Sequence, residues 1–279
     1  MSIRVVTDSS SDLPPELVKA WDIVVVPCYV MLGDVTYQDG VSLSAEDFYG
    51  SLTTSLRPPT TAQPSPADFQ SVYQALLDQG HEIVSIHVSG KLSGTVNSAE
   101  RARAALGEPA PIEVVDSRMA SLGLGLVALA AARRAREAAS CRQLAQEVRR
   151  ALPQTHCILV LDTLEYLQKG GRIGKAQAFV GSLLSVKPIL KLVDGEVHPV
   201  ERPRNLERGV RRVAELAREY APLGQLGIIY STEPERAADL KRSLADLLPE
   251  EEIITSRFGP TLGTYVGPKA LGVALTSAP

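Results

Sequence analysis

Cysteine, histidine and aromatic residues are scarce in this chain of 279 residues. Its three cysteines, Cys28, Cys141 and Cys157, are widely spaced and form no CxxC pair, so the sequence predicts neither a disulfide framework nor a thiolate metal site. The four histidines lie at no metal-ligand spacing, and we expect no metal or other cofactor. Because aromatic residues make up only 5% of the chain, the interior is expected to be mainly aliphatic.

The chain also lacks a large excess of charge of either sign and lacks a long apolar run. A net charge of -3 makes nucleic acid an unexpected partner. Apolar stretches such as 122–132 are too short to span a bilayer, and no signal sequence follows Met1. We therefore expect a cytoplasmic protein that is not embedded in a membrane, with transient membrane contact left open. Several arginine pairs occur at helical spacing among Ala, Glu and Leu, and we interpret them as solvated helix faces: Arg133, Arg134, Arg149, Arg150, Arg211 and Arg212.

Short β-branched runs alternate with helical patterns through the first half of the chain. This β-α-β rhythm is typical of a parallel sheet with helices on both faces. Strands are expected at 3–7, 23–27, 82–88 and 112–115, with helices beginning near 14, 44, 66, 94, 117 and 140.

The rhythm changes after residue 155. Residues 187–193 and 196–200 flank an Asp194-Gly195 turn and predict a β-hairpin. Further strands are expected at 157–161 and 225–230 and near 253 and 273, with helices at 205–220 and 234–247. The sequence thus predicts an N-terminal three-layer α/β/α domain over residues 1–154 and a C-terminal α+β domain with a mixed sheet over residues 155–279.

Segment 87–95 (HVSGKLSGT) joins an apolar run to a helical pattern through a Ser/Gly turn. Amides at a helix N-terminus have no intrahelical partner, so such a turn favours an anion. The backbone N–H groups of Gly94 and Thr95 and the hydroxyls of Ser93 and Thr95 are the expected donors. A plain helix N-cap role for Ser93 stays open as the alternative.

Three other segments resemble known functional motifs but do not satisfy them. Segment 170–176 is not a P-loop, because Lys169 stands where glycine is needed and Ala176 where Ser or Thr is needed. Segment 123–128 nominally fits a dinucleotide fingerprint but lies inside a helical pattern, which favours close helix packing. Segment 90–94 has its serine one position late for a nucleophile elbow. A hydrolase that uses Ser93 with His87 and Asp116 remains an alternative.

Six segments in register resemble the DegV family of bacterial fatty-acid-binding proteins. They span nearly the whole chain: 6–14 (VTDSSSDLP), 61–66 (TAQPSP), 92–95 (LSGT), 115–117 (VDS), 166–173 (YLQKGGRI), and 259–260 (GP) with 267–272 (GPKALG). The resemblance implies a two-domain α/β protein that buries one long-chain fatty acid, such as palmitate, between its domains. It also implies that the hydroxyls of Thr61 and Ser93 hold the carboxylate.

Family members often serve as the acyl-carrying subunit of a bacterial fatty-acid kinase, so the resemblance implies a carrier that is not itself an enzyme. Tyr265 stands where the family commonly has a histidine near the lipid head, which weakens a kinase-coupled role. Arg204 matches the family's basic residue after the hairpin. A regulatory protein whose lipid is a signal is a further alternative.

The rest of the expected site follows from position and residue type. Polar clusters that end predicted strands place Asp8, Ser9 and Asp116 near the head group. The resemblance adds Arg204 and Tyr265 as further neighbours of the head group. The wall around the acyl chain should be apolar and partly small. The expected wall residues are Gly123, Leu124, Leu164, Ile173, Phe179, Val180, Leu183 and Val266.

Overall fold

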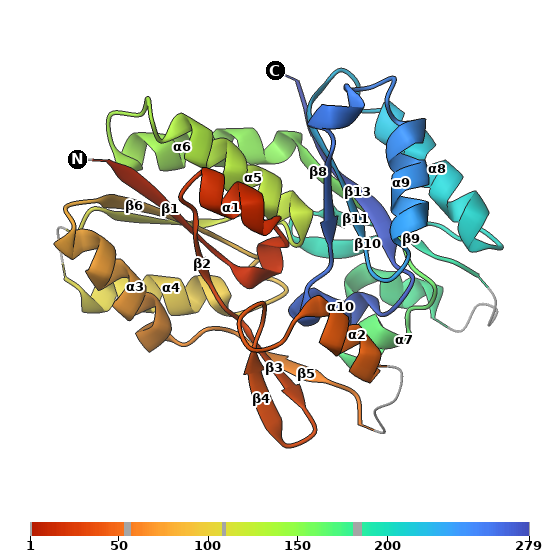
Figure 1. Cartoon of the computed structure of the whole chain (residues 1–279), viewed down its shortest axis with the longest axis horizontal. Coiled ribbons are helices and arrows are strands. Elements are labelled where there is room, and N and C mark those ends of the chain that lie inside the picture. Colours follow the sequence, from red (N-terminus) through yellow and green to blue (C-terminus); the bar gives the residue numbers. More distant parts are fainter. Residues whose placement is uncertain (1, 53–56, 108–109, 181–185, 279) are drawn as a thin grey trace.

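Two β-sheets lie on either side of one buried helix, α5 (Leu122–Arg134), in the computed structural model (Figure 1). The structure describes residues 2–52, 57–107, 110–180 and 186–278. Helix α5 contacts β1 and β6 of the first sheet and β8, β11 and β13 of the second. Ten of its residues are buried, which matches a helix that is apolar on nearly every side.

The first sheet is parallel throughout, as the β-α-β rhythm predicts. Helices α3 (Pro66–Asp78) and α4 (Thr95–Ala105) cover one face, while α5 and α6 (Cys141–Ala151) cover the other. The three-layer α/β/α prediction is therefore confirmed. Its strands in spatial order are β2 (Val24–Val26), β1 (Ile3–Asp8), β6 (Glu82–His87) and β7 (Ile112–Asp116).

Glycines at the contacts of α5 let neighbouring segments approach this helix closely. A Cβ at Gly125 would lie 2.6 Å from the backbone oxygen of Ser11. From the opposite side, a Cβ at Gly227 of β11 would lie 2.4 Å from Leu122. The glycine pattern at 123–128 therefore serves close helix packing, as predicted.

The second sheet is mixed. Strands β11 and β12 are parallel, and the other neighbours are antiparallel. Asp194 and Gly195 both have positive φ, 48° and 80°, which is the backbone that a two-residue hairpin turn requires. In spatial order the strands are β10 (Glu196–Glu201), β9 (Ile189–Val193), β8 (Thr155–Val160), β13 (Leu271–Ser277), β11 (Leu223–Tyr230) and β12 (Ile254–Arg257).

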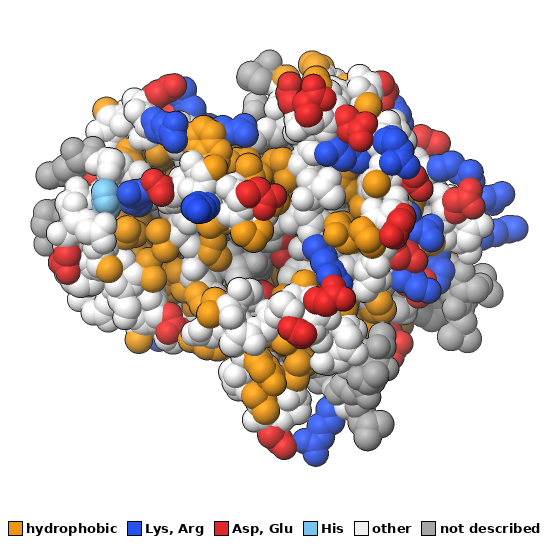
Figure 2. Space-filling view, viewed as in Figure 1, with side chains coloured by type: hydrophobic (Ala, Val, Ile, Leu, Met, Phe, Trp, Pro, Cys, Tyr) orange, Lys and Arg blue, Asp and Glu red, His pale blue; other side chains and the backbone are white. Residues whose placement is uncertain are grey.

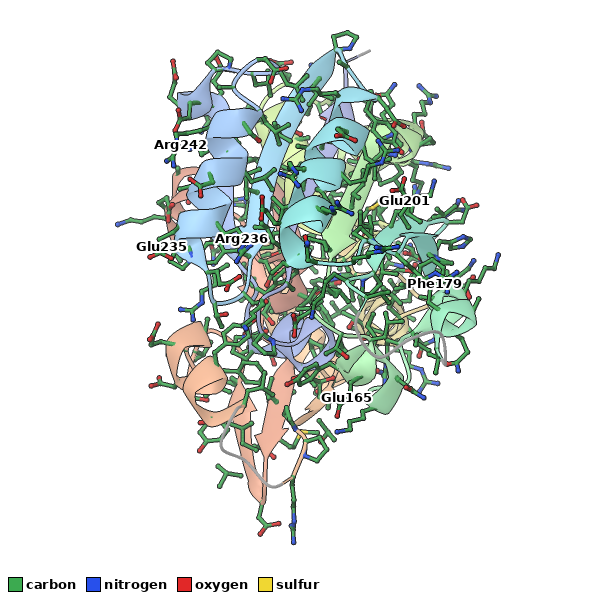
Figure 3. The ribbon with its side chains drawn as sticks, turned by 90° about the vertical axis from the view of Figure 1, so that its right-hand side faces the viewer. Glu165, Phe179, Glu201, Glu235, Arg236 and Arg242 are labelled. Atoms are coloured by element: carbon green, nitrogen blue, oxygen red, sulfur yellow. The ribbon has the colours of Figure 1, made fainter. Side chains whose placement is uncertain are left out.

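Helices α8 (Leu206–Arg218) and α9 (Pro234–Ser243) cover the outer face of the second sheet. Charged side chains of both signs alternate over them (Figures 2 and 3). Arg211 pairs with Glu207 at 3.0 Å, and Arg212 pairs with Glu201 at 2.9 Å. The arginines of α8 thus form a solvated, ion-paired helix face, as the sequence predicts.

The sequence analysis did not foresee a third, small antiparallel sheet. It consists of β4 (Val35–Gln38), β3 (Tyr29–Leu32) and β5 (Thr60–Ala62), and its β3–β4 hairpin projects from the body in Figure 1. Helix α10 (Pro260–Val266) returns from the C-terminal half and contacts β3, β5, α2 (Ala45–Leu52) and α7 (Glu165–Lys169). The division of the chain near residue 155 stays a prediction.

Short elements complete the chain. Helix α1 begins with a proline at its first position, as predicted. No helix among the described residues has the length and apolar character needed to cross a membrane. The remaining short elements are α1 (Pro15–Ala20), η1 (Ser9–Ser11), η2 (Leu152–Gln154), η3 (Gly174–Phe179) and η4 (Glu250–Glu252).

Candidate functional site

An apolar cavity of about 350 Å³ lies where the ends of β1, β2 and β6 face β8 and β9. We call it the inner cavity. Its volume falls in the range of small-molecule sites, roughly 300–1,000 Å³. Leucine and valine dominate its wall, with a few hydroxyls, thiols and two cations. The lining residues that carry the discussion below are Thr61, Ser93, Cys157, Leu159, Leu161, Arg172, Leu190, Lys191, Leu192, Tyr265 and Val266.

The aliphatic wall arises from strand alternation in β8 and β9. Cys157, Leu159 and Leu161 line the inner cavity, whereas Ile158 and Val160 pack with the helices on the opposite face. In β9, Leu190 and Leu192 face the cavity in the same way. The sequence analysis missed these residues, because segment 157–161 (CILVL) is apolar throughout and its sequence shows no alternation.

Two hydroxyls meet at the mouth of the inner cavity. Thr61 of β5 and Tyr265 of α10 lie with Oγ1 and the phenolic oxygen 2.5 Å apart. Thr61, Arg172 and Tyr265 also line a second space of about 360 Å³, which we call the outer cleft. The guanidinium of Arg172 lies over the Tyr265 ring at 5.3 Å and donates a hydrogen bond to the Leu92 carbonyl. These three residues therefore separate an apolar interior from a polar exterior.

A second hydroxyl pair lies at the start of α4. Ser93 Oγ and Thr95 Oγ1 are 2.9 Å apart, and Ser93 lines the inner cavity whereas Thr95 is fully buried behind it. The Gly94 amide donates to Oε1 of Gln63 at 3.2 Å, and the Thr95 amide donates to Ser93 Oγ at 3.4 Å. The sequence analysis expected both amides to be free for an anion, and this was wrong because neighbouring side chains already accept from them.

The hydroxyl pairs still leave donors for an anion. Each hydroxyl carries one proton, and two hydroxyls joined by one hydrogen bond use only one of their two protons. The Thr61–Tyr265 pair and the Ser93–Thr95 pair can therefore each direct one O–H toward an acceptor. Two such donors match the two oxygens of a carboxylate.

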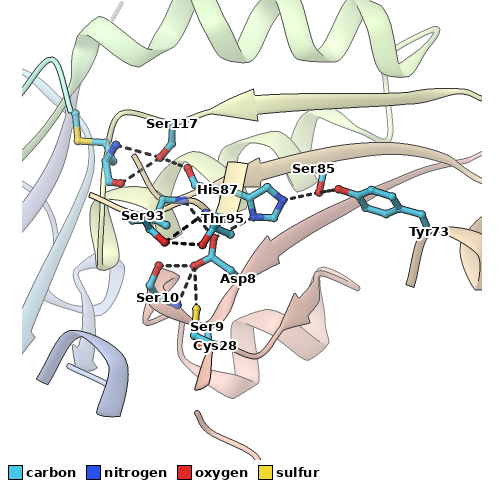
Figure 4. A network of polar contacts seen from close by, with 12 residues as sticks. Asp8, Ser9, Ser10, Cys28, Tyr73, Ser85, His87, Ser93, Thr95 and Ser117 are labelled. Atoms are coloured by element: carbon cyan, nitrogen blue, oxygen red, sulfur yellow. Dashed lines mark hydrogen bonds and ion pairs between the residues drawn. The ribbon is translucent and has the colours of Figure 1, made fainter. Parts of the chain in front are cut away.

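Asp8 is the centre of a buried polar network (Figure 4). Its carboxylate accepts from the backbone amides of Ser10 and Val88, each at 3.1 Å, and from the Ser10 hydroxyl. His87 Nδ1 lies 3.0 Å from Asp8 Oδ2, and both side chains are fully buried. Asp8 does not line the inner cavity. Its hydrogen bonds to His87 and Val88 instead join the end of β1 to the end of β6.

The same network argues against the hydrolase alternative. The second ring nitrogen of His87, Nε2, lies 2.7 Å from Ser85 Oγ, which in turn accepts from the Tyr73 hydroxyl at 2.7 Å. Asp116 accepts from the amides of Gly90 and Arg118. Within the described part of the chain, Ser93 therefore has no contact with His87, and the proposed triad is not assembled.

Ser9, expected near the head group, instead donates to the carboxylate of Asp39 at 2.9 Å. The amide of Thr261 donates to the same carboxylate at 3.3 Å. Burial raises the pKa of Asp39 to about 6, against the lowering effect of these hydrogen bonds. Burial likewise raises the pKa of the nearby Asp12 well above its ordinary value.

Asp39→Asn is expected to change how stability depends on pH. Since the carboxyl's pKa is about 6 in the folded protein and about 3.9 unfolded, its stabilising contribution is largest below about pH 4. It is lost as the pH rises through the folded pKa. The free energy of unfolding of the wild type relative to Asp39→Asn should fall by roughly 2 kcal/mol between about pH 4 and pH 7. Urea unfolding of both proteins checks this, and a difference independent of pH would contradict it.

The other expected site residues lie in several places. Val266 lines the inner cavity, and Gly123, Leu124 and Ile173 are buried beside it in the core. Leu164 and Val180 are half-buried against the same core. Phe179 lies under the guanidinium of Arg202 at 4.7 Å, toward the viewer in Figure 3. Arg204 is exposed between β10 and α8, and Leu183 lies outside the described residues.

Arg172 is a lining residue that the sequence analysis missed. It belongs to the segment that fails as a P-loop, where Gly171 and Gly174 adopt positive φ of 70° and 52° between α7 and η3. Cys28, Cys141 and Cys157 are all free and buried. Among the residues that the structure describes, no group of three or more His, Cys, Asp or Glu could hold a metal ion.

Comparisons with known proteins show which proteins this chain resembles over its whole length. A family model described as "Uncharacterised protein, DegV family" matches residues 2–278. A DegV domain-containing protein of Caldanaerobacter subterraneus is 36% identical over 275 residues, 97% of each chain. A structure described as fatty acid binding of a DegV family protein from Thermus thermophilus is 35% identical, with a TM-score of 0.92 over all of both chains. The structure of DegV from Bacillus subtilis, described as a fatty acid binding protein, is 32% identical, with a TM-score of 0.88 over all of both chains.

Proposed function

This chain belongs to the DegV family, and on that premise we propose that it binds one long-chain fatty acid in the inner cavity. The observation that carries the proposal is an aliphatic cavity that has two hydroxyl pairs in its wall, one of them at its mouth. The similar proteins from Thermus thermophilus and Bacillus subtilis, both described as binding fatty acids, support the same ligand class.

The acyl chain supplies the binding energy. Burial of apolar surface contributes about 0.8 kcal/mol per methylene, hence on the order of 12 kcal/mol for fifteen methylenes before ordering costs. Leu159, Leu161, Leu190 and Leu192 present such a surface from two adjacent strands. The acyl chain therefore supplies the larger share of the binding free energy, and the head group adds affinity and fixes the orientation of the ligand.

In this proposal the carboxylate lies between Thr61 and Ser93. A carboxylate removed from water needs hydrogen-bond donors, and each charge-assisted bond contributes roughly 1.5 to 3 kcal/mol. Thr61, paired with Tyr265, and Ser93, paired with Thr95, each have a hydroxyl proton to give. The nearby Arg172 adds a positive charge at the mouth without occupying either hydroxyl.

We also propose that the protein is a carrier that presents this carboxylate to a separate ATP-binding kinase. Thr61 and Tyr265 line both the inner cavity and the outer cleft, so a carboxylate between them would be reachable from outside. Tyr265 supplies a hydroxyl where the family's histidine supplies a titratable ring. The phenol can therefore hold the head group as a hydrogen-bond donor.

Native mass spectrometry of the purified protein tests lipid binding. We expect a retained mass of fatty-acid size, and the delipidated protein should take up one palmitate. Leu159→Trp should reduce uptake because the indole would fill the inner cavity, whereas Val35→Trp on the exposed hairpin should not. Incubation with ATP alone should leave bound palmitate unmodified. A clean apo mass with no uptake of palmitate or oleate would refute the proposal.

A further inference from the structure

The two hydroxyls of the proposed carboxylate site come from different sheets. Thr61 lies in β5, which pairs with β3 of the small sheet. Ser93 lies in the turn between β6 and α4, beside the first sheet. Among the described strands, β5 does not pair with the first sheet. The distance between the two hydroxyls therefore depends on side-chain contacts, and one carboxylate can accept from both only if that distance suits it.

Gln63 makes such a contact. It follows Thr61 by two residues, and its side-chain amide lies against the start of α4. Oε1 accepts from the Gly94 amide at 3.2 Å, and Nε2 donates to Ser98 Oγ at 3.4 Å, one turn further along the helix. Gln63 also lines the inner cavity together with Thr61 and Ser93. One side chain thus connects the segment that carries Thr61 to the residue next to Ser93.

The glycine at position 94 leaves room for this contact. A Cβ on Gly94 would lie 2.5 Å from Nε2 and 2.6 Å from Oε1 of Gln63, which is too close for either atom. The φ of Gly94 is -79°, a value that any residue adopts, so backbone freedom does not explain a glycine here. Space for the Gln63 amide does explain it.

The turn that carries Ser93 keeps its internal shape through its own backbone. The amides of Leu92 and Ser93 both donate to the Ser89 carbonyl, at 2.9 and 3.1 Å. The contribution left for Gln63 is the position of this turn relative to β5. Its two hydrogen bonds are long and its side chain is exposed, so we expect a contribution of a few-fold in affinity.

A second route between the same segments is indirect. Arg172 donates to the Leu92 carbonyl and lies over the Tyr265 ring. Tyr265 in turn contacts Thr61. Because this route passes through two further side chains, it constrains the distance between the hydroxyls less closely than the single amide of Gln63 does.

We propose that Gln63 is a positioning residue that fixes the spacing between the hydroxyls of Thr61 and Ser93, so that one carboxylate accepts from both. This inference rests on the proposed fatty-acid function and adds to it a residue that acts through the two donors. When the spacing is fixed before the ligand arrives, binding has fewer groups to order, and affinity rises. A ligand without a charged carboxylate gains little from this arrangement.

Titration calorimetry of palmitate with delipidated protein tests the inference in three backgrounds. Gln63→Ala in the otherwise wild-type chain should weaken palmitate binding about three- to tenfold, the range for neutral hydrogen bonds. The same substitution in Ser93→Ala or in Thr61→Val should change the palmitate Kd by less than about twofold. A site with one hydroxyl has no spacing to keep, so the effects should not add.

Gln143→Ala is the matched control. Gln143 is also exposed at the start of a helix, accepts from the Ala139 amide at 3.3 Å and donates to Glu147 at 2.9 Å. Its substitution should leave the palmitate Kd unchanged in every background. Methyl palmitate should bind the wild type and Gln63→Ala nearly equally, because it has no charged carboxylate to share between two donors.

Three results would overturn the inference while palmitate still binds the wild type. One is a Gln63→Ala protein that binds palmitate as tightly as the wild type or more tightly. Another is a loss of the same size in all three backgrounds, as direct contact with the ligand or a general change of the fold would give. The third is a loss that persists in only one of Ser93→Ala and Thr61→Val, which would assign Gln63 to a single hydroxyl. Failure of palmitate to bind the wild type would instead count against the proposed function itself.

Discussion

Replacing Thr61 by valine and Ser93 by alanine in one protein is expected to weaken palmitate binding by two to four orders of magnitude. Each substitution removes one charge-assisted hydrogen bond worth roughly 1.5 to 3 kcal/mol, or roughly a ten- to hundredfold loss of affinity. Valine keeps the shape of Thr61, and alanine leaves Thr95 without its hydroxyl partner. Titration calorimetry on delipidated protein measures the loss.

Two controls separate the head group from the rest of the ligand. Methyl palmitate has no charged carboxylate, so its affinity should change far less than that of palmitate. Thr36→Val and Ser71→Ala repeat the chemistry on exposed positions of β4 and α3 and should leave both affinities unchanged. Equal palmitate binding by the double variant and the wild type would eliminate the proposed carboxylate site.

Asp8→Ala is expected to lower the free energy of unfolding by about 3 to 5 kcal/mol, because several buried donors lose one acceptor and each such loss costs roughly 1 to 3 kcal/mol. The substitution strips the acceptor from two buried backbone amides, from the Ser10 hydroxyl and from His87. These donors are shielded from bulk solvent in the native state, because Asp8, Ser10 and His87 are at most 2% exposed. Each donor therefore keeps its desolvation cost without compensation.

Urea unfolding measures this effect, provided that the slope with denaturant stays constant. Asp116→Ala is the matched control, because Asp116 also ends a strand and also accepts from two amides, but is only partly buried. Its loss should cost about 1 to 2 kcal/mol. Equal destabilisation by the two substitutions would show that the buried Asp8 network contributes no more to the free energy of unfolding than the partly buried Asp116.

Local patterns predicted most of the two large sheets. Motifs of a few neighbouring residues predict the 87–95 turn, the Asp194-Gly195 hairpin and the alternating helices. The structure contains each of these elements. The antiparallel sheet β4-β3-β5 and helix α10 have weaker signals. Strand β5 has only three residues, and the position of α10 depends on contacts with residues some 200 positions earlier.

The candidate site was predictable where residue type and family resemblance coincided. Thr61, Ser93 and Tyr265 line one cavity, and the resemblance had named all three. Leu159 and Leu190 escaped prediction because a strand that is buried on both faces reads as a continuous apolar run, which hides its alternation. Asp8 was expected beside the ligand because it ends a strand, yet its carboxylate is used entirely within the protein.

The contact between Thr61 and Tyr265 joins residues that are 204 positions apart. During synthesis, a chain that still lacks α10 would contain the strands of the first sheet, but Thr61 would have no contact with Tyr265. The cavity therefore cannot be complete before α10 has been synthesised. A ligand that binds in the completed cavity would stabilise the folded protein by mass action. It would do so by contacting Thr61 and Tyr265 together, two residues that are synthesised far apart in time.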